Sequence, residues 1–224
     1  MEERMNKDIQ LDKHESPDDR SLPIVMKRKL DLVILSYMAR KVHVMLHSLD
    51  QAPTINRGAT ISQPFLYYLD ERHKRTHRIA IYNPQELLLN NELPFVGFVS
   101  LRRKSLSPLF LDELRALDKR LVAELVNTPG LLSYSSLELH DGNWCNLVLF
   151  GNASAKIHVT NNNTHTYAAY EFAPRCYEWI RLHSGIMPAG LAGNEMLLQR
   201  TKYYTFLEVH QRPILREVSY QQDS

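Results

Sequence analysis

Histidines are the side chains of this 224-residue sequence best suited to proton transfer or metal binding, and there are ten of them. His158 and His165 lie seven residues apart. On an unbroken helix they would share one face, separated by a rise of about 10.5 Å. That separation is too long for both to bind one metal ion, because a helical ligand pair usually needs a spacing of three or four residues. Each imidazole could act alone as a base or proton shuttle, and a surface or capping role is the alternative.

A second candidate set lies on a predicted strand at residues 176–184, where every other side chain faces the same way. Arg181 could hold a ligand carboxylate through two parallel hydrogen bonds, and the neighbouring rings could form an apolar wall. The structural alternative is that Arg181 pairs with Glu138 or Glu178 and that the rings belong to the core. The predicted members of this ligand-binding face are Tyr177, Trp179, Arg181 and His183.

Other kinds of chemistry find little support in the sequence. His43 and His47 have a metal-compatible spacing of four, but no third ligand is evident nearby, so no metal site is predicted. Cys145 and Cys176 are not part of a CxxC motif, and Cys145 lies in an apolar run that is typical of a buried thiol. The sequence has no GxSxG motif, and GLAGNE lacks the spacing of a phosphate-binding loop.

Lysine and arginine total 27 against 25 aspartate and glutamate, so the formal net charge is +2. This balance argues against nucleic acid as a partner, although it leaves room for a local anion site. Apolar residues make up 44% of the chain, which is typical of a globular protein. No apolar run reaches the roughly 18 residues of a membrane span, and the polar start lacks the apolar core of a secretory signal. A cytoplasmic protein without a transmembrane segment is expected.

Residues 1–24 are predicted to form a disordered tail, because they are polar and contain few large apolar side chains. Residues 26–49 are predicted to be a helix with an apolar face and a largely basic opposite side. Such a helix could lie on an anionic membrane, or it could pack on the domain or on a second subunit. A β-hairpin of strands 65–69 and 78–82 follows, so that residues 25–94 form an N-terminal extension. The polar side of the helix carries Lys27, Arg28, Asp31, Arg40, Lys41 and His47.

Residues 95–185 are predicted to fold as a ferredoxin-like βαββαβ core, within an overall α+β class. One face of its sheet would remain open, and an open apolar face must be buried by a second copy of the chain or by the N-terminal strands. Residues 186–224 form a C-terminal extension with edge strands at 196–199 and 213–218, packed on the core. The predicted elements of the core are a strand at 95–103, a helix from Pro108 to Thr128, a half-exposed strand at 131–140, a strand at 144–150, a helix at 152–172 that the Asn161–Asn163 run could break (with a short hairpin as the alternative), and a strand at 176–184.

This order of elements resembles the dimeric α/β-barrel superfamily, which includes the antibiotic-biosynthesis monooxygenases and related haem-degrading and stress-response proteins. The resemblance rests on FVGFVSLRR, the leucine-striped helix ending in NTPG, the strand LLSYSSLEL, and NWCNLVLFGNASAKIHVTNNNTH, with its Trp-led strand and spaced histidines. It implies a homodimer and a pocket between the sheet and its helices for an aromatic substrate or haem.

Within such a pocket, the resemblance assigns His165 the role of base or haem ligand, Arg181 that of anion anchor, and Trp144 and Trp179 those of pocket walls. His158 is the second candidate catalytic residue. The expected function is binding of a small apolar or aromatic molecule, with a monooxygenase-like oxidation, cofactor-free or haem-assisted, as the expected reaction. The alternative is a non-enzymatic interaction protein that docks a partner through the helix at 26–49.

Overall fold

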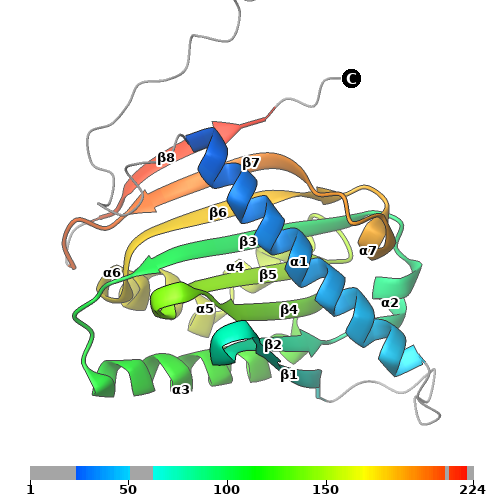
Figure 1. Ribbon diagram of the computed structural model, residues 1–224, viewed down its shortest axis with the longest axis horizontal. Helices are drawn as coiled ribbons and strands as arrows, with labels where there is room; N and C mark the ends of the chain where they lie inside the picture. The colour runs from blue at the N-terminus through cyan, green and yellow to red at the C-terminus, as the bar shows by residue number, and fades with distance from the viewer. Residues whose placement is uncertain (1–23, 51–62, 210–211, 221–224) are drawn as a thin grey trace, which may run out of the picture.

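One antiparallel sheet of eight strands organises the chain in the computed structural model, which describes residues 24–50, 63–209 and 212–220 (Figure 1). The class is therefore α+β. The strands lie in the order β1-β2-β4-β5-β3-β6-β7-β8. They are β1 (Phe65–Glu71), β2 (Arg75–Ile81), β3 (Leu93–Arg102), β4 (Leu131–Glu138), β5 (Trp144–Phe150), β6 (Tyr177–Met187), β7 (Leu197–Thr205) and β8 (Ile214–Ser219).

The middle of the sheet, β4-β5-β3-β6, comes from the segment predicted to form the core. The helix α3 (Pro108–Glu124) connects β3 to β4, as the sequence predicts. Ser107 caps it by accepting a hydrogen bond from the backbone N–H of Phe110, and Pro108 fills the first turn, where no backbone donor is needed. Both extensions lengthen this same sheet, because β1 and β2 continue it beyond β4, and β7 and β8 continue it beyond β6.

The connection between β5 and β6 is helical, as predicted, and the helix breaks at the asparagine run, where the sequence left a break open. Its parts are α4 (Ala155–Thr160), α5 (Asn163–Tyr167), a π-helical turn (Ala168–Phe172) and α6 (Ala173–Cys176). The Asn162 side chain accepts a hydrogen bond from the backbone N–H of His165 and so starts a new helix after the break. On the C-terminal side, the predicted edge strand at 196–199 is the first part of the longer strand β7, which also contains Tyr203 and Tyr204.

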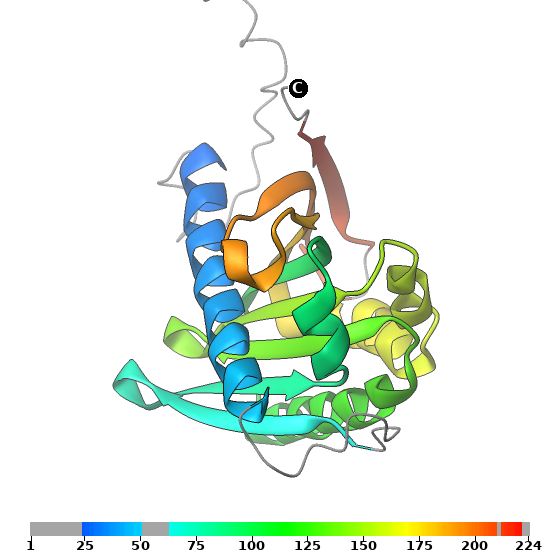
Figure 2. The same ribbon diagram turned by 90° about the vertical axis from the view of Figure 1, so that its right-hand side faces the viewer.

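The long helix α1 (Ile24–Asp50) crosses one face of the sheet, and α3 to α6 cover the other (Figures 1 and 2). Leu35, Met38, Val42 and Leu46 are 0–1% exposed and pack against β3, β4 and β5 in the largest core cluster. The Leu35 side chain of α1 packs directly on Gly97 of β3, where an added Cβ would lie 2.4 Å from a methyl of Leu35. The open face that the sequence assigned to a second sheet is therefore covered by a helix of the same chain.

Two sequence-based predictions about exposure need correction. The first is the strand at 131–140, which was predicted to be half-exposed, whereas residues 131–137 of β4 are all buried. Leu132 and Leu137 pack under α1, while Leu131 and Tyr134 pack with α3 and α4 on the other face. The second is the polar side of α1, because Asp31 and Lys27 are only 2% and 4% exposed and face the protein.

Two short helices and three 3-10 turns lie between the larger elements described above. The helix α2 (Pro84–Leu89) precedes β3, and α7 (Gly190–Gly193) follows β6. Short 3-10 turns lie at 72–74, 125–127 and 140–142. Of the tail predicted at 1–24, only Ile24, the first residue of α1, lies within the described residues. None of the helices described here combines the length and apolar character that a membrane crossing requires.

Candidate functional site

The seven residues that the sequence singled out are divided between the two faces of the sheet. Trp179, Arg181 and His183 point from β6 toward α1. Trp144 points to the other face, because its strand neighbour Cys145 belongs to the core beneath α1 and side chains alternate along a strand. His158 and His165 lie on that other side as well, on α4 and α5. The structure therefore does not bring Trp144, His165 and Arg181 together in one pocket.

Tyr177 is also separated from the other three aromatic and charged residues of its strand. The pairing of β3 with β6 shifts register where Leu101 pairs with Trp179 and Arg102 with Tyr177, so that Glu178 is an extra, bulged residue. The bulge turns the Tyr177 ring to the face away from α1, where it meets Phe98 edge-on with a ring-centre distance of 5.5 Å. The predicted four-residue face thus consists of three residues.

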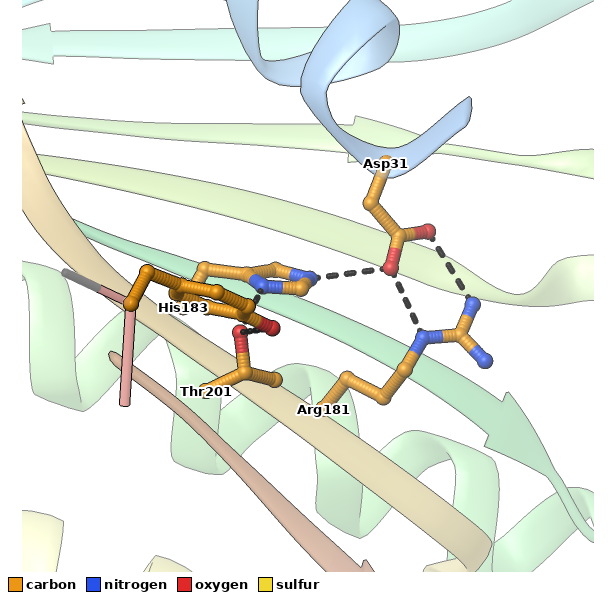
Figure 3. Close-up of polar contacts among 5 residues, drawn as sticks. Asp31, Arg181, His183 and Thr201 are labelled. Carbon is orange, nitrogen blue, oxygen red and sulfur yellow. Dashed lines mark hydrogen bonds and ion pairs between the residues drawn. The ribbon is translucent and has the colours of Figure 1, made fainter. Parts of the chain in front are cut away.

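The feature that the sequence did not predict is a buried polar cluster around Asp31 of α1 (Figure 3). Arg181 donates two hydrogen bonds to the carboxylate, from Nε to Oδ2 over 2.7 Å and from Nη2 to Oδ1 over 3.0 Å. His183 Nε2 lies 2.9 Å from the same Oδ2. The guanidinium also stacks over the Trp179 ring, 4.0 Å from its centre. Arg181 was predicted to hold a ligand carboxylate or to pair with Glu138 or Glu178, and in the structure it pairs with the carboxylate of Asp31.

The hydrogen-bond chain continues from His183 to β7 and the C-terminal segment. His183 Nδ1 lies 2.9 Å from Thr201 Oγ1, and the Tyr220 hydroxyl donates to the same Oγ1 over 3.1 Å. With the imidazole proton on Nε2, His183 donates to Asp31 and accepts from Thr201. The order hydroxyl–imidazole–carboxylate is that of a nucleophilic triad. Thr201, His183 and Asp31 are, however, 0–2% exposed, so a substrate cannot reach them and their role is to attach α1 to the sheet.

The charge state of Asp31 follows from these contacts. Burial by itself would raise the pKa of this carboxyl, but hydrogen bonds from His183 and Arg181 outweigh burial and hold the pKa below its ordinary value. Asp31 is therefore ionised in the folded protein at neutral pH and balances the buried guanidinium.

A second polar cluster lies under the middle of α1. The Tyr37 hydroxyl donates to Glu71 Oε2, and His77 Nδ1 lies 3.1 Å from Glu71 Oε1. His77 Nε2 is 2.8 Å from Ser135 Oγ, and the imidazole is completely buried. Burial lowers the pKa of His77, and Glu71 opposes that shift without cancelling it. In the neutral tautomer, Nδ1 donates to Glu71 and Nε2 accepts from Ser135, so every ring nitrogen has a partner.

The His77 cluster makes the stability of the protein depend on pH. A histidine whose pKa is lowered by folding contributes stability that is complete above the unfolded pKa of about 6.5 and is lost as the pH falls below it. We expect the free energy of unfolding, measured in urea, to decrease between about pH 7 and pH 5. His77→Gln, which cannot titrate, should show a weaker decrease over this range. Equal slopes for both proteins would contradict the assignment. The lowered carboxyl pKa values of Asp31 and Glu71 act only at more acidic pH.

The two candidate catalytic histidines do not form a haem site. His158 is exposed on α4, while His165 is half-buried on α5, where burial lowers its pKa. An axial ligand must face a slot wide enough for the porphyrin. On this side of the sheet the interface with α3 is filled by the stacked rings of Phe110 and Phe172, whose centres are 4.5 Å apart, with Tyr167 beside them. These residues do not fit a haem group.

Metal chemistry has no visible centre within the part of the chain that the structure describes, where no group of three or more histidine, cysteine, aspartate or glutamate side chains is placed to hold an ion. His43 and His47 do meet, with their Nε2 atoms 2.8 Å apart on the outer part of α1. Cys145 and Cys176 are both free and buried, and burial raises the pKa of each thiol. Neither sulfur is therefore an activated nucleophile.

Of the buried polar residues that were not predicted from the sequence, Asp31 could have been recognised from its position in the helical period. Asp31 precedes Leu35, Met38 and Val42 at intervals of four, three and four, so its position on the apolar face could have been read from the helical period. A lone acid on such a face requires a buried partner. Glu71, His77 and Thr201 carried no comparable signal, because each depends on pairing between distant segments.

Comparisons with known proteins place this α+β chain in no family. No protein-family model matches the sequence. No curated protein matches it either. A solved structure with some similarity is the crystal structure of protein SO0527 from Shewanella oneidensis, with 12% sequence identity and a TM-score of 0.38. That match covers 44% of this chain and 93% of the other. A TM-score this low supports no conclusion about fold or function.

Proposed function

We propose that this chain is a non-enzymatic interaction protein whose helix α1 docks a partner protein through its outward face. The observation that carries the proposal is a second apolar stripe on α1, opposite the one that packs on the sheet. This outer stripe is made of residues with large exposed fractions, namely Met26 (50%), Leu30 (51%), Val33 (64%) and Val44 (54%). Residues 26, 30, 33 and 44 fall on one side of a helix with 3.6 residues per turn. Met26, Leu30 and Val33 form an exposed apolar patch over the first turns of this side, and Val44 lies further along the same side beyond Arg40. Exposed apolar surface on a helix is typical of helix-mediated recognition.

The charges around the outer stripe indicate the chemistry of the partner. Lys29 and Arg40 are exposed beside the stripe, and Arg28 and Lys41 flank it half-exposed. Among the α1 side chains that the structure describes, the acid is Asp31, which is buried against Arg181. Pairing of two copies of α1 would bring like charges together, whereas an apolar groove lined with carboxylates would complement the helix. The partner is therefore an acidic protein surface. The stripe also lacks the Trp and Phe residues typical of helices that lie in a membrane interface.

The inner contacts of α1 give this docking face a defined shape. The helix is attached near its start by Asp31 to β6 and at its middle by Tyr37 to the end of β1. A helix that is already ordered loses little conformational entropy on binding. Removing α1 would destroy the core, so the docking face must be tested by single substitutions.

The structure of the middle of the sheet leads to a finer proposal about the fold. We propose that β3 to β6 form a ferredoxin-like core, as the sequence predicts. The support is the antiparallel order β4-β5-β3-β6, in which α3 links the first two strands in chain order and helices link the last two. The face on which a homodimer mate was expected carries α1, and the predicted ligand-binding residues lie on both faces. The monooxygenase-like function and the homodimer that the sequence led us to expect therefore draw no support from a shared pocket or an open sheet.

The docking proposal predicts a position-specific cross-link. A photoreactive amino acid at position 33 should capture one discrete protein in the cells that produce this chain, whereas the same amino acid at Ala116 on the exposed side of α3 should not. The captured protein is then purified and its affinity for the chain measured. Val33→Asp should weaken binding by about tenfold or more, because it places a charge in the apolar centre of the contact. Arg40→Glu should also weaken it, and more strongly at low salt.

The control for these measurements is Ala116→Asp, which carries the same new charge on another exposed helix and should leave the affinity unchanged. Thermal unfolding of each variant shows that the fold is intact. Capture of a second copy of the chain, equal capture from positions 33 and 116, or no capture would each contradict the proposal. Co-flotation with vesicles containing about 30% phosphatidylserine, abolished by Val33→Asp, would assign the face to a membrane instead.

A further inference from the structure

A cluster of basic side chains lies on the face of the sheet opposite α1, where β6, β7 and β8 run side by side. Ser184 of β6 pairs with Arg200 of β7, and Lys202 of β7 pairs with Glu217 of β8. These side chains point away from α1, because the alternate residue Thr201 points toward it. From α4, Lys156 reaches over this surface, and its Nζ donates a hydrogen bond to Ser184 Oγ over 2.8 Å.

The cluster holds three cations and one carboxylate. Glu217 pairs with Arg200 (Nη1 to Oε1, 3.2 Å) and with Lys202 (Nζ to Oε2, 3.6 Å). Lys156 has a neutral hydroxyl as its hydrogen-bond partner. Burial lowers the pKa of Lys156, and the charges of Arg200 and Lys202 lower it further against the opposing effect of Glu217. The folded protein thus holds a partly desolvated ammonium beside two other cations, an arrangement that a bound anion would stabilise.

We propose that this cluster is a binding site for a phosphate group, either free phosphate or the phosphate of a small monoester. A phosphate dianion accepts hydrogen bonds from an ammonium, a guanidinium and a hydroxyl together, and these are the donors of Lys156, Arg200 and Ser184. The site is open to solvent on one side, since the Arg200 and Lys202 side chains are 43% and 33% exposed. Tyr204 lies on the same face of β7, and the charges of Arg200 and Glu217 influence the pKa of its hydroxyl. It adds a hydroxyl and a ring at the edge of the basic cluster.

This site is independent of the docking face on α1, from which it is separated by the sheet. In this proposal the basic cluster, and not Arg181, binds the anion. Arg181, which the sequence suggested for that role, is buried and paired with Asp31. The arginine and lysine of β7 and the lysine of α4 become neighbours only through strand pairing and the packing of α4.

The test is a titration of the full-length protein with inorganic phosphate at constant ionic strength, followed by the side-chain NMR signals of lysine and arginine. The signals of Lys156, Arg200 and Lys202 should shift together and saturate in the millimolar range. Lys156→Met keeps the length of the side chain without its charge and should weaken binding by about tenfold or more. Lys119→Met, at an exposed position on α3, is the matched control and should bind phosphate as the unmodified protein does.

A second variant separates a binding site from a merely structural ion-pair cluster. Glu217→Gln removes the carboxylate and should tighten phosphate binding by about three- to tenfold, because repulsion of the anion is relieved. If phosphate binds weaker or equally to this variant, or if the Lys156 signals do not saturate, the proposal is wrong. Phenyl phosphate in place of phosphate distinguishes the sources: tighter binding than phosphate indicates a monoester, and equal binding indicates the free ion. Saturable binding of a single-stranded oligonucleotide in the absence of phosphate binding would overturn the assignment.

Discussion

Replacing Asp31 by alanine is expected to lower the free energy of unfolding by about 3–5 kcal/mol. The substitution leaves the Arg181 guanidinium and the His183 imidazole buried without the carboxylate that accepts from both. An uncompensated buried cation is among the most destabilising changes in a protein core, whereas an exposed ion pair contributes little. The measurement is equilibrium unfolding in urea near neutral pH.

The control for this prediction is Asp112→Ala, which removes an exposed carboxylate paired with Arg115 on α3. That change is expected to alter stability by no more than about 0.5 kcal/mol. The double substitution Asp31→Leu with Arg181→Met removes both charges and should recover part of the loss, because an apolar pair of similar volume avoids the desolvation of the ions. The remainder reflects the buried His183 imidazole, which still lacks its acceptor. A loss below about 1 kcal/mol for the single variant would show that α1 is not held to the sheet by this contact.

The second large effect is expected at the closest approach of α1 to the sheet. Leu35→Ala should cost about 2–5 kcal/mol, because Leu35 is completely buried and its removal leaves a cavity over β3. Gly97→Ala should cost about 1–3 kcal/mol, because the new methyl group would meet the Leu35 side chain at 2.4 Å. Urea unfolding of both variants gives the two values.

The double variant Leu35→Ala with Gly97→Ala tests whether these residues are in contact. The alanine methyl at position 97 fills part of the space that Leu35 leaves, so the combined loss should be smaller than the sum by about 1 kcal/mol or more. Val33→Ala, one position on the exposed stripe of the same helix, is the control and should change stability by less than about 0.5 kcal/mol. Strict additivity would mean that α1 does not pack on β3 as described.

The secondary structure could largely be predicted because its signals are local. The Ser107-Pro108 start and the leucine period of α3 depend on residues within a few turns of one another. The break between α4 and α5 was visible in the asparagine run. The bulge at Glu178 was not visible, since it arises from how β6 pairs with β3, and it removed Tyr177 from a face on which simple alternation had placed it.

The candidate site could not be predicted to the same extent, because its chemistry depends on which surfaces meet. His158 and His165 were chosen for a spacing that matters only on an unbroken helix, and the helix ends between them. Arg181 was predicted to hold a ligand carboxylate, but in the structure it binds the carboxylate of Asp31. Asp31 lies on a helix that the sequence allowed to face a membrane, a second subunit or the domain. Because the side of α1 that carries Asp31 packs on the sheet, Arg181 is paired within the protein and is not available to a ligand.

The sequence by itself determined the elements, their order along the chain, the basic amphipathic character of α1 and the near-neutral total charge. The tertiary structure alone decided that α1 lies on the open sheet and that Asp31 meets an arginine 150 residues away. It also decided that Lys156 of α4 reaches Ser184 of β6, the strand partner of Arg200. The physical reason is one of range. The period and the caps of a helix depend on residues that are close in the sequence. A buried charge pairs with its partner only after the apolar surfaces around the two residues have packed together.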